Sequence, residues 1–176
     1  FAEDQLQASL NKIASFGTRN LALAYFSKPE GKEALFRLLK ATPAVNQACF
    51  LHNVAGSRRF KQFEWLAESA KAESAAVAGQ IFTLAEPARS QKLAQTISLI
   101  EKCGADKPTE LVSFSVLLDV LMSESLSANL ADSSDGQAVL RRIKALKDQI
   151  RSVSSEDKAA LVNTLEPEII RDGWFD

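Results

Sequence analysis

The chain is poor in the residues on which most metal and catalytic sites depend. Among its 176 residues there are one histidine, His52, and two cysteines, Cys49 and Cys103. A structural zinc site needs four protein ligands and a catalytic one needs three, so this supply predicts no metal site. Two cysteines make no disulfide framework, and both lie in apolar stretches, so we expect them to be reduced and buried.

Glycine is also scarce, and its seven copies are scattered singly along the chain. Loops that bind phosphate need clustered glycines, so that several backbone N–H groups can point at the ligand. No Gly-x-Ser-x-Gly motif occurs, and no small-residue motif next to Cys49 would expose its thiol as a nucleophile for His52 to activate. These absences predict a protein that is not an enzyme and that carries no cofactor.

Long apolar runs are missing as well. None approaches the ~20 residues that a membrane-spanning helix requires. No signal-peptide pattern opens this fragment, which begins at Phe1. With 46% hydrophobic and 24% charged residues, the composition is typical of a globular domain. We therefore expect a soluble protein that works in a cytoplasm or is delivered into one.

What the chain has instead is helical periodicity. Apolar residues recur at spacings of three and four, and capping residues separate one run from the next. The pattern predicts an all-α, single-domain protein of about eight helices, either a multi-helix bundle or an irregular stack of helix pairs. The sequence LVSFSV at 111–116 alternates with period two, but it has no partner strand, so we expect a helix there as well.

Several helix boundaries and faces follow from this pattern. Gly17 separates a helix that ends at Phe16 from a short second helix capped by Thr18. In the third helix, which Ser27 and Glu30 cap, the predicted apolar face comprises Leu35, Phe36, Leu38 and Leu39. The last long helix begins at Ser154 or Ser155 and ends at Leu165, before a short turn that starts at Pro167.

The serine-rich stretch 123–136 has the weakest helical pattern in the chain, and we predict a loop with at most one helical turn there. It divides a main helical bundle over residues 1–122 from a C-terminal helical hairpin over 137–176 that packs on the bundle. The first helix of the hairpin, 137–150, has an apolar stripe formed by Leu140, Ile143, Leu146 and Ile150. This helix could contribute to an interaction surface. Its charged residues are predicted to face away from the stripe: Arg141, Arg142, Lys144, Lys147 and Asp148.

Positive charge is concentrated between Lys28 and Lys61. This stretch carries seven basic and two acidic residues, whereas 62–176 carries twelve basic and eighteen acidic ones. Such asymmetry indicates a surface for a partner of opposite charge. We therefore predict a non-catalytic protein-interaction domain, of adaptor, scaffold or effector type, that binds an acidic surface of another protein. The candidate partner-binding residues are Arg58, Arg59, Lys61, Arg37 and Lys40.

Two other functions compete with this prediction. The order helix, glycine turn, helix around Gly56 fits a helix-turn-helix that binds nucleic acid, with basic residues at the start of the second helix. Against it, His52 is bulky where that turn needs a small residue, and the whole chain is slightly acidic. The third candidate is an enzyme with a pocket lined by aromatic residues. Nine of the aromatic residues of the chain lie in its first 65 positions.

No motif identifies a family. The alanine-rich helices and isolated capping residues resemble those of many bacterial helical domains, including effector and secretion-apparatus modules.

Overall fold

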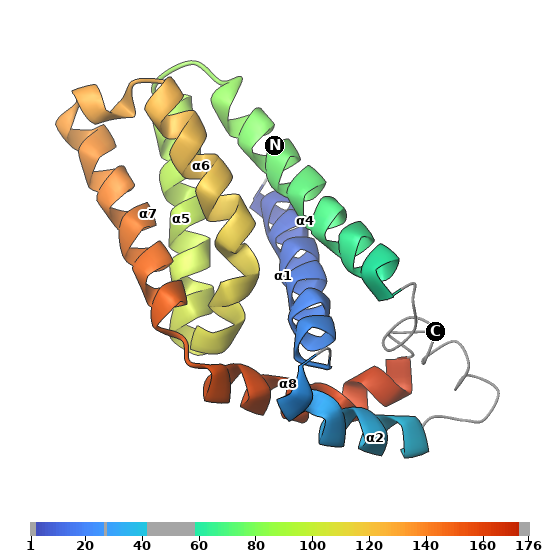
Figure 1. Ribbon diagram of the computed structural model, residues 1–176. Coiled ribbons are helices and arrows are strands. Elements are labelled where there is room, and N and C mark those ends of the chain that lie inside the picture. Colours follow the sequence, from blue (N-terminus) through green and yellow to red (C-terminus); the bar gives the residue numbers. More distant parts are fainter. Residues whose placement is uncertain (1–2, 27, 42–58, 173–176) are drawn as a thin grey trace. The chain divides into compact units, whose positions relative to one another are not determined.

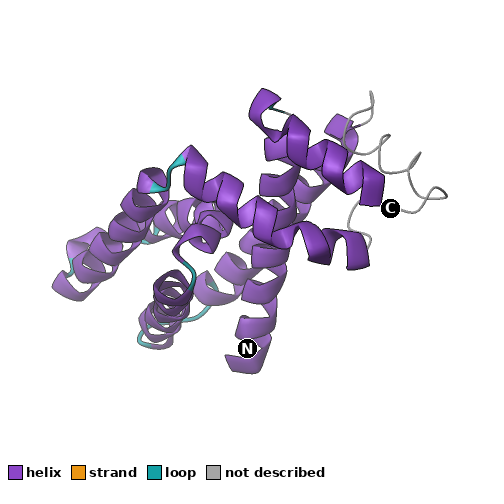
Figure 2. Cartoon of the chain, turned by 90° about the horizontal axis from the view of Figure 1, so that it is seen from below, coloured by secondary structure: helices purple, strands orange, loops and turns teal. Residues whose placement is uncertain are grey.

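The computed structural model describes residues 3–26, 28–41 and 59–172. These residues form seven α-helices and three short 3-10 helices, and they contain no strand. Figure 2 shows this all-helical composition, in which short loops join the helices. The all-α class predicted from the periodicity is confirmed, with a helix count close to the predicted eight.

The order of elements along the chain is visible in the colours of Figure 1. It runs α1 (Glu3–Phe26), η1 (Pro29–Gly31), α2 (Lys32–Ala41), α4 (Arg59–Phe82), α5 (Ala88–Asp106), η2 (Pro108–Phe114), α6 (Ser115–Ser127), η3 (Leu130–Asp132), α7 (Ser134–Ser152) and α8 (Ser155–Asp172).

Contacts group the residues into two compact units. Unit 1 comprises Phe1–Phe16 and Ser69–Val153, and unit 2 comprises Gly17–Glu68 and Ser154–Asp176. The helices α5, α6 and α7 belong to unit 1 and the helices α2 and α8 to unit 2, while α1 and α4 contribute one part to each. These units describe packing, and the domain boundaries predicted from the sequence stay a prediction.

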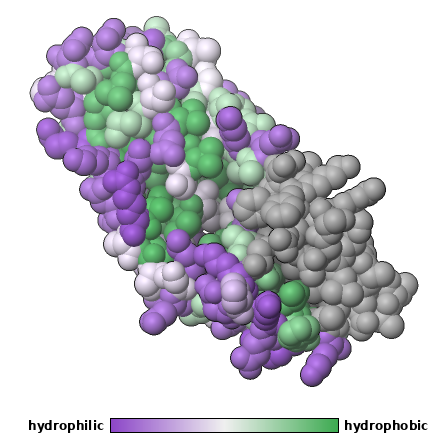
Figure 3. Space-filling model, in the orientation of Figure 1, coloured by the Kyte–Doolittle hydropathy of each residue, from purple (hydrophilic) through white to green (hydrophobic). Residues whose placement is uncertain are grey.

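The core of unit 1 forms where apolar faces of its helices pack together. Within it, α5, α6 and α7 lie side by side (Figure 1). On the outside, hydrophobic and hydrophilic residues alternate over α6 and α7 (Figure 3), and Leu126 of α6 is 53% exposed. The buried residues at the centre of the core are Leu6, Leu10, Ile13, Val77, Ile81, Leu93, Ile97, Ile100, Leu117, Leu118, Leu121 and Ile143.

The stretch 111–116 is helical, as predicted. Most of it belongs to the 3-10 helix η2, in which residues three apart share a face. Leu111 and Phe114 are buried on that face, and α6 continues it with Leu117 and Leu121. The apparent period of two therefore hides a period of three to four.

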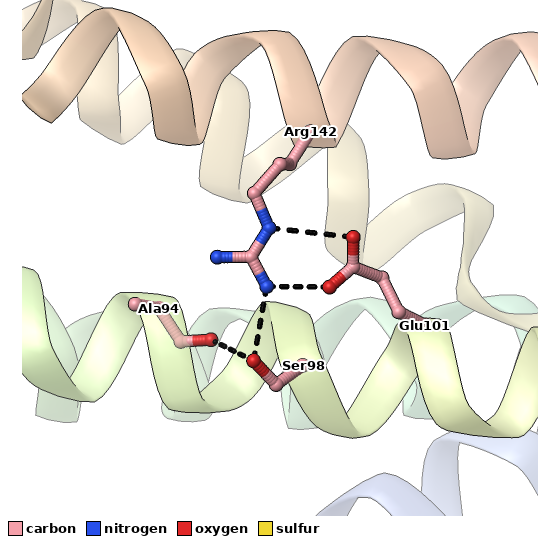
Figure 4. A network of polar contacts seen from close by, with 4 residues as sticks. All are labelled: Ala94, Ser98, Glu101 and Arg142. Atoms are coloured by element: carbon pink, nitrogen blue, oxygen red, sulfur yellow. Dashed lines mark hydrogen bonds and ion pairs between the residues drawn. The ribbon is translucent and has the colours of Figure 1, made fainter.

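Helix α7 has the predicted apolar stripe, but two of its charged residues do not face away. The Nε and Nη2 groups of Arg142 both donate hydrogen bonds to the carboxylate of Glu101 on α5 (Figure 4). Nη2 also donates to the Oγ of Ser98 at 2.9 Å. On the other side, the ammonium of Lys147 lies 2.9 Å from the carboxylate of Asp119 on α6.

These ion pairs correct the prediction that all the charged residues of the helix face away, whereas its contribution to an interaction surface stays a prediction. Its apolar side is occupied by unit 1, because Ile143 and Leu146 are buried in the core. Two cations at the edges of the stripe, Arg142 and Lys147, attach α7 to α5 and α6. Hydrogen bonding to Glu101 accordingly raises the pKa of Arg142 above its ordinary value.

The serine-rich stretch 123–136 is helical at both ends, and the predicted long loop is wrong in that respect. Helix α6 continues to Ser127 and ends where Asn129 adopts a left-handed conformation with φ of 61°. Ser133 then caps α7, because its Oγ accepts a hydrogen bond from the backbone N–H of Gly136 at 3.0 Å. A Cβ added to Gly136 would lie 1.8 Å from the carbonyl oxygen of Leu130, so only glycine fits this turn.

Two predicted helix boundaries are also wrong. Helix α1 passes through Gly17 without a break, and Thr18 is buried within the helix and does not cap a second one. A glycine costs a helix interior only about 1 kcal/mol, which packing of the neighbouring turns offsets. Helix α8 is capped by the Oγ of Ser154 as predicted, but it continues through Pro167 to Asp172.

Candidate functional site

Helix α2 is the part of the predicted basic region for which the structure gives side-chain positions. A sharp turn at Gly31, just before the helix, leads the chain into it from α1. A Cβ added to Gly31 would lie 2.1 Å from the carbonyl oxygen of Tyr25, so a side chain at this position would push the two helices apart. The phenolic hydroxyl of Tyr25 donates a hydrogen bond to the carbonyl oxygen of Glu30 across the same turn.

One face of α2 is buried within unit 2. Ala34 and Leu38 are 2% and 0% exposed, and the helix packs against α8. Leu35 is buried beside them, as predicted. Phe36 was predicted to share this apolar face, and that prediction is wrong, because the ring is 59% exposed.

The geometry of an α-helix explains the position of Phe36. Successive residues turn by about 100°, so Phe36 lies roughly 150° away from the direction that Ala34, Leu35 and Leu38 share. The same rotation brings Lys32 and Lys40, four residues before and after Phe36, onto its side of the helix. The sequence holds this signal, and counting apolar residues without placing them on the helix misses it.

The exposed face of α2 is basic. Lys32, Arg37 and Lys40 are exposed there, and Lys28 is exposed in the preceding turn. Arg37 forms an ion pair with Glu33 one turn earlier, at 3.6 Å. Lys32 and Lys40 have no ion pair or hydrogen-bond partner among the described residues. We call Lys32, Phe36, Arg37 and Lys40 the α2 face.

The five residues predicted to bind a partner are therefore only partly placed. Arg37 and Lys40 lie on the α2 face, where the structure brings them together with Lys32 and Phe36. Arg59 and Lys61 belong to the first turn of α4, but their side chains lie outside the described residues. Arg58 lies outside them altogether, as do Cys49, His52 and Gly56.

Unit 2 also contains a cavity of about 310 Å³. Its apolar wall is formed by Leu21 and Tyr25 near the end of α1. Its polar rim is formed by the turn after α1 and by the start of α8. Lys28 and Lys158 at the rim are matched by Glu30 and Glu156, so the rim carries no net charge. Its size is at the lower limit for small-molecule sites.

Cys103 is the cysteine that the structure describes, and it is a free thiol that is half-buried in unit 1. Burial is the main cause that raises the pKa of this thiol, and Glu110 adds to the effect. The thiol is therefore protonated at neutral pH and a poor nucleophile. A cavity of about 210 Å³ lies beside it, lined among others by Leu99 and Phe114.

The described residues show no group of three or more histidine, cysteine or acidic side chains that could hold a metal ion. None of the helices in the ranges 3–26, 28–41 and 59–172 is long and apolar enough to cross a membrane. Comparison of the chain with protein-family models, with curated proteins and with solved structures finds no match.

Proposed function

We propose that the protein is a non-catalytic interaction domain that binds an acidic surface of another protein through the basic region 28–61. The observation that supports this proposal is the α2 face, on which Lys32 and Lys40 are exposed and have no partner among the described residues. Exposed cations without partners in the fold can pair with a binding partner without breaking an existing ion pair, and they add mainly to specificity and association rate.

The proposal contrasts with the role of the cations on α7. Arg142 and Lys147 are paired with Glu101 and Asp119 of the same unit. An acidic partner would have to compete with those carboxylates, whereas at Lys32 and Lys40 no carboxylate of the described residues competes with it. Electrostatic attraction of this kind weakens as salt rises, because the screening length falls to about 8 Å at physiological ionic strength.

The test begins with affinity purification of the full chain, followed by binding measurements with the purified partner. Two charge-reversed variants are compared, Lys32→Glu with Lys40→Glu and the triple variant Arg58→Glu, Arg59→Glu and Lys61→Glu. The control reverses Lys102 and Lys144, two exposed lysines of unit 1. We expect at least one test variant to bind about tenfold more weakly, and the control to bind like the wild type. Unchanged binding by both test variants would contradict the proposal.

A helix-turn-helix that binds nucleic acid remains the competing proposal for the same basic region. Its contacts would be to phosphates, so its affinity for duplex DNA should fall steeply between about 50 and about 200 mM salt. An electrophoretic mobility-shift series with a mixed-sequence duplex measures this directly. No shift at the lowest salt removes the competing proposal.

A further inference from the structure

Among the described residues, three large apolar side chains are exposed: Phe36, Leu126 and Val116. Phe36 is the most exposed of the three, and it is aromatic. Its exposed fraction of 59% means that the ring adds little to the packing of α2 on α8. Figure 3 shows a small hydrophobic patch near α2 with hydrophilic residues along part of its edge. An isolated exposed apolar residue needs no explanation by itself, so the case for Phe36 depends on its neighbours.

Those neighbours are two cations at helical spacing. Lys32 lies one turn before Phe36 and Lys40 one turn after it, on the same side of α2. With a rise of 1.5 Å per residue, the two lysine Cα atoms are about 12 Å apart along the helix axis, with the ring midway between them. Both lysines lack a partner among the described residues.

A partner that complements this face must carry an apolar site between two carboxylates at a similar separation. A helix with Glu, Leu and Glu at positions i, i+4 and i+8 presents that arrangement along one side, since it has the same rise per residue. A flat anionic surface, such as a lipid headgroup layer, would attract the lysines without any need for the fixed spacing. The combination of two exposed cations and an apolar ring between them is matched by an acidic amphipathic helix of a protein partner, and vesicle binding is tested below as the other outcome.

We propose that Phe36 is the apolar anchor through which the α2 face binds an acidic amphipathic helix of another protein, with Lys32 and Lys40 pairing with carboxylates on either side of it. This inference rests on the proposed function and adds to it the anchor residue and the partner class. Binding buries the exposed ring against the partner's apolar side chain, and an aromatic residue enclosed by charged contacts is typical of a binding hot spot.

The experiment uses the full chain and two synthetic alanine-rich peptides of about 20 residues, longer than the ~12–15 residues below which isolated helices are marginal in water. The first carries Glu-x-x-x-Leu-x-x-x-Glu on one side, and the second has lysine in place of both glutamates. Fluorescence anisotropy measures binding of each labelled peptide to the wild type and to Phe36→Ala. Leu126→Ala is the matched control, because Leu126 is 53% exposed but lies on α6.

We expect the wild type to bind the acidic peptide and not the basic one. Phe36→Ala should weaken binding about tenfold, and Leu126→Ala should leave it unchanged. Because alanine is the best helix former, Phe36→Ala should keep the circular dichroism spectrum of the wild type. Absence of binding of the acidic peptide to the wild type, or equal binding by Phe36→Ala, overturns the inference.

Further outcomes separate this inference from the proposal on which it rests. If Lys32→Glu with Lys40→Glu weakens binding of the purified partner but Phe36→Ala does not, the anchor is wrong and the basic surface stands. If neither variant changes partner binding, the α2 face is rejected for both. If the wild type binds vesicles with about 30% phosphatidylserine through Phe36 and does not bind the acidic peptide, the partner class is wrong.

Discussion

Helices α7 and α2 are both amphipathic and both carry several basic residues, yet their cations have different environments. On α7, Arg142 and Lys147 flank a buried stripe and pair with carboxylates of α5 and α6. On α2, Lys32 and Lys40 flank an exposed ring and lack partners among the described residues. The cations of a basic helix can therefore be used within the fold, as on α7, or left exposed, as on α2, where we propose that they bind a partner.

Packing around the two helices has one feature in common. Each follows a turn in which glycine is required, Gly31 before α2 and Gly136 in the first turn of α7. In both cases a Cβ would meet the carbonyl oxygen of an earlier residue, at 2.1 Å from Tyr25 and at 1.8 Å from Leu130. Both helices thus begin where a side chain would clash with the backbone, and they differ in the faces that they present.

The largest expected effects are those of Gly31→Ala and Gly136→Ala. Each added methyl group forces a backbone carbonyl to move, and Gly136→Ala also disturbs the cap formed by Ser133. We expect each to lower the free energy of unfolding by at least about 3 kcal/mol, measured by urea denaturation. As a control, Gly79→Ala should be neutral or stabilise by up to about 1 kcal/mol, because nothing lies within 4 Å of its Cβ position. Equal stability of all three variants would contradict the close contacts.

The second prediction compares the apolar residues of the two helices. Ile143→Ala on α7 empties part of the core of unit 1 and should lower the free energy of unfolding by about 3 kcal/mol. Phe36→Ala on α2 removes an exposed ring and should change it by less than about 0.5 kcal/mol. Urea denaturation followed by circular dichroism measures both. A large loss of stability in Phe36→Ala would mean that the ring serves the fold.

The third prediction concerns the cations and is smaller. Arg142→Gln with Lys147→Gln should lower the free energy of unfolding by about 1 kcal/mol, since the pairs are partly exposed and screened by water. Lys32→Gln with Lys40→Gln should change it by less than about 0.3 kcal/mol, as neither side chain loses an ion pair with any described residue. Raising the salt concentration should shrink the first effect. Loss of the same size in both double variants would remove the distinction between the helices.

The apolar stripe of α7 and the all-α class were predictable, because they depend on spacing within one helix. The pairing of Arg142 was not, since Glu101 lies 41 residues away and nothing local indicates that α5 and α7 are neighbours. The continuity of α1 through Gly17 was missed for a similar reason. The local cost of a glycine is visible in the sequence, whereas the burial of Ile13 and Ala22 on either side of it is not.

The α2 face was half predictable. Arg37 and Lys40 were predicted from the charge asymmetry, while Phe36 was counted with Leu35, Leu38 and Leu39 as part of one apolar face. Rotation by about 100° per residue separates Phe36 from Leu35 and Leu38, so the helical geometry carried the information that the count of apolar residues did not. Lys32 was counted in the basic region, and its place beside Phe36 is what makes it part of the proposed binding face.

We propose that Lys32 and Lys40 of α2 serve binding, whereas Arg142 and Lys147 of α7 serve the fold. Binding of the labelled acidic peptide by the two double glutamine variants, at about 50 mM salt, tests it most directly. We predict that Lys32→Gln with Lys40→Gln binds about tenfold more weakly than the wild type, whereas Arg142→Gln with Lys147→Gln binds equally well. Wild-type affinity in the α2 variant, or equal losses in both, would contradict the claim.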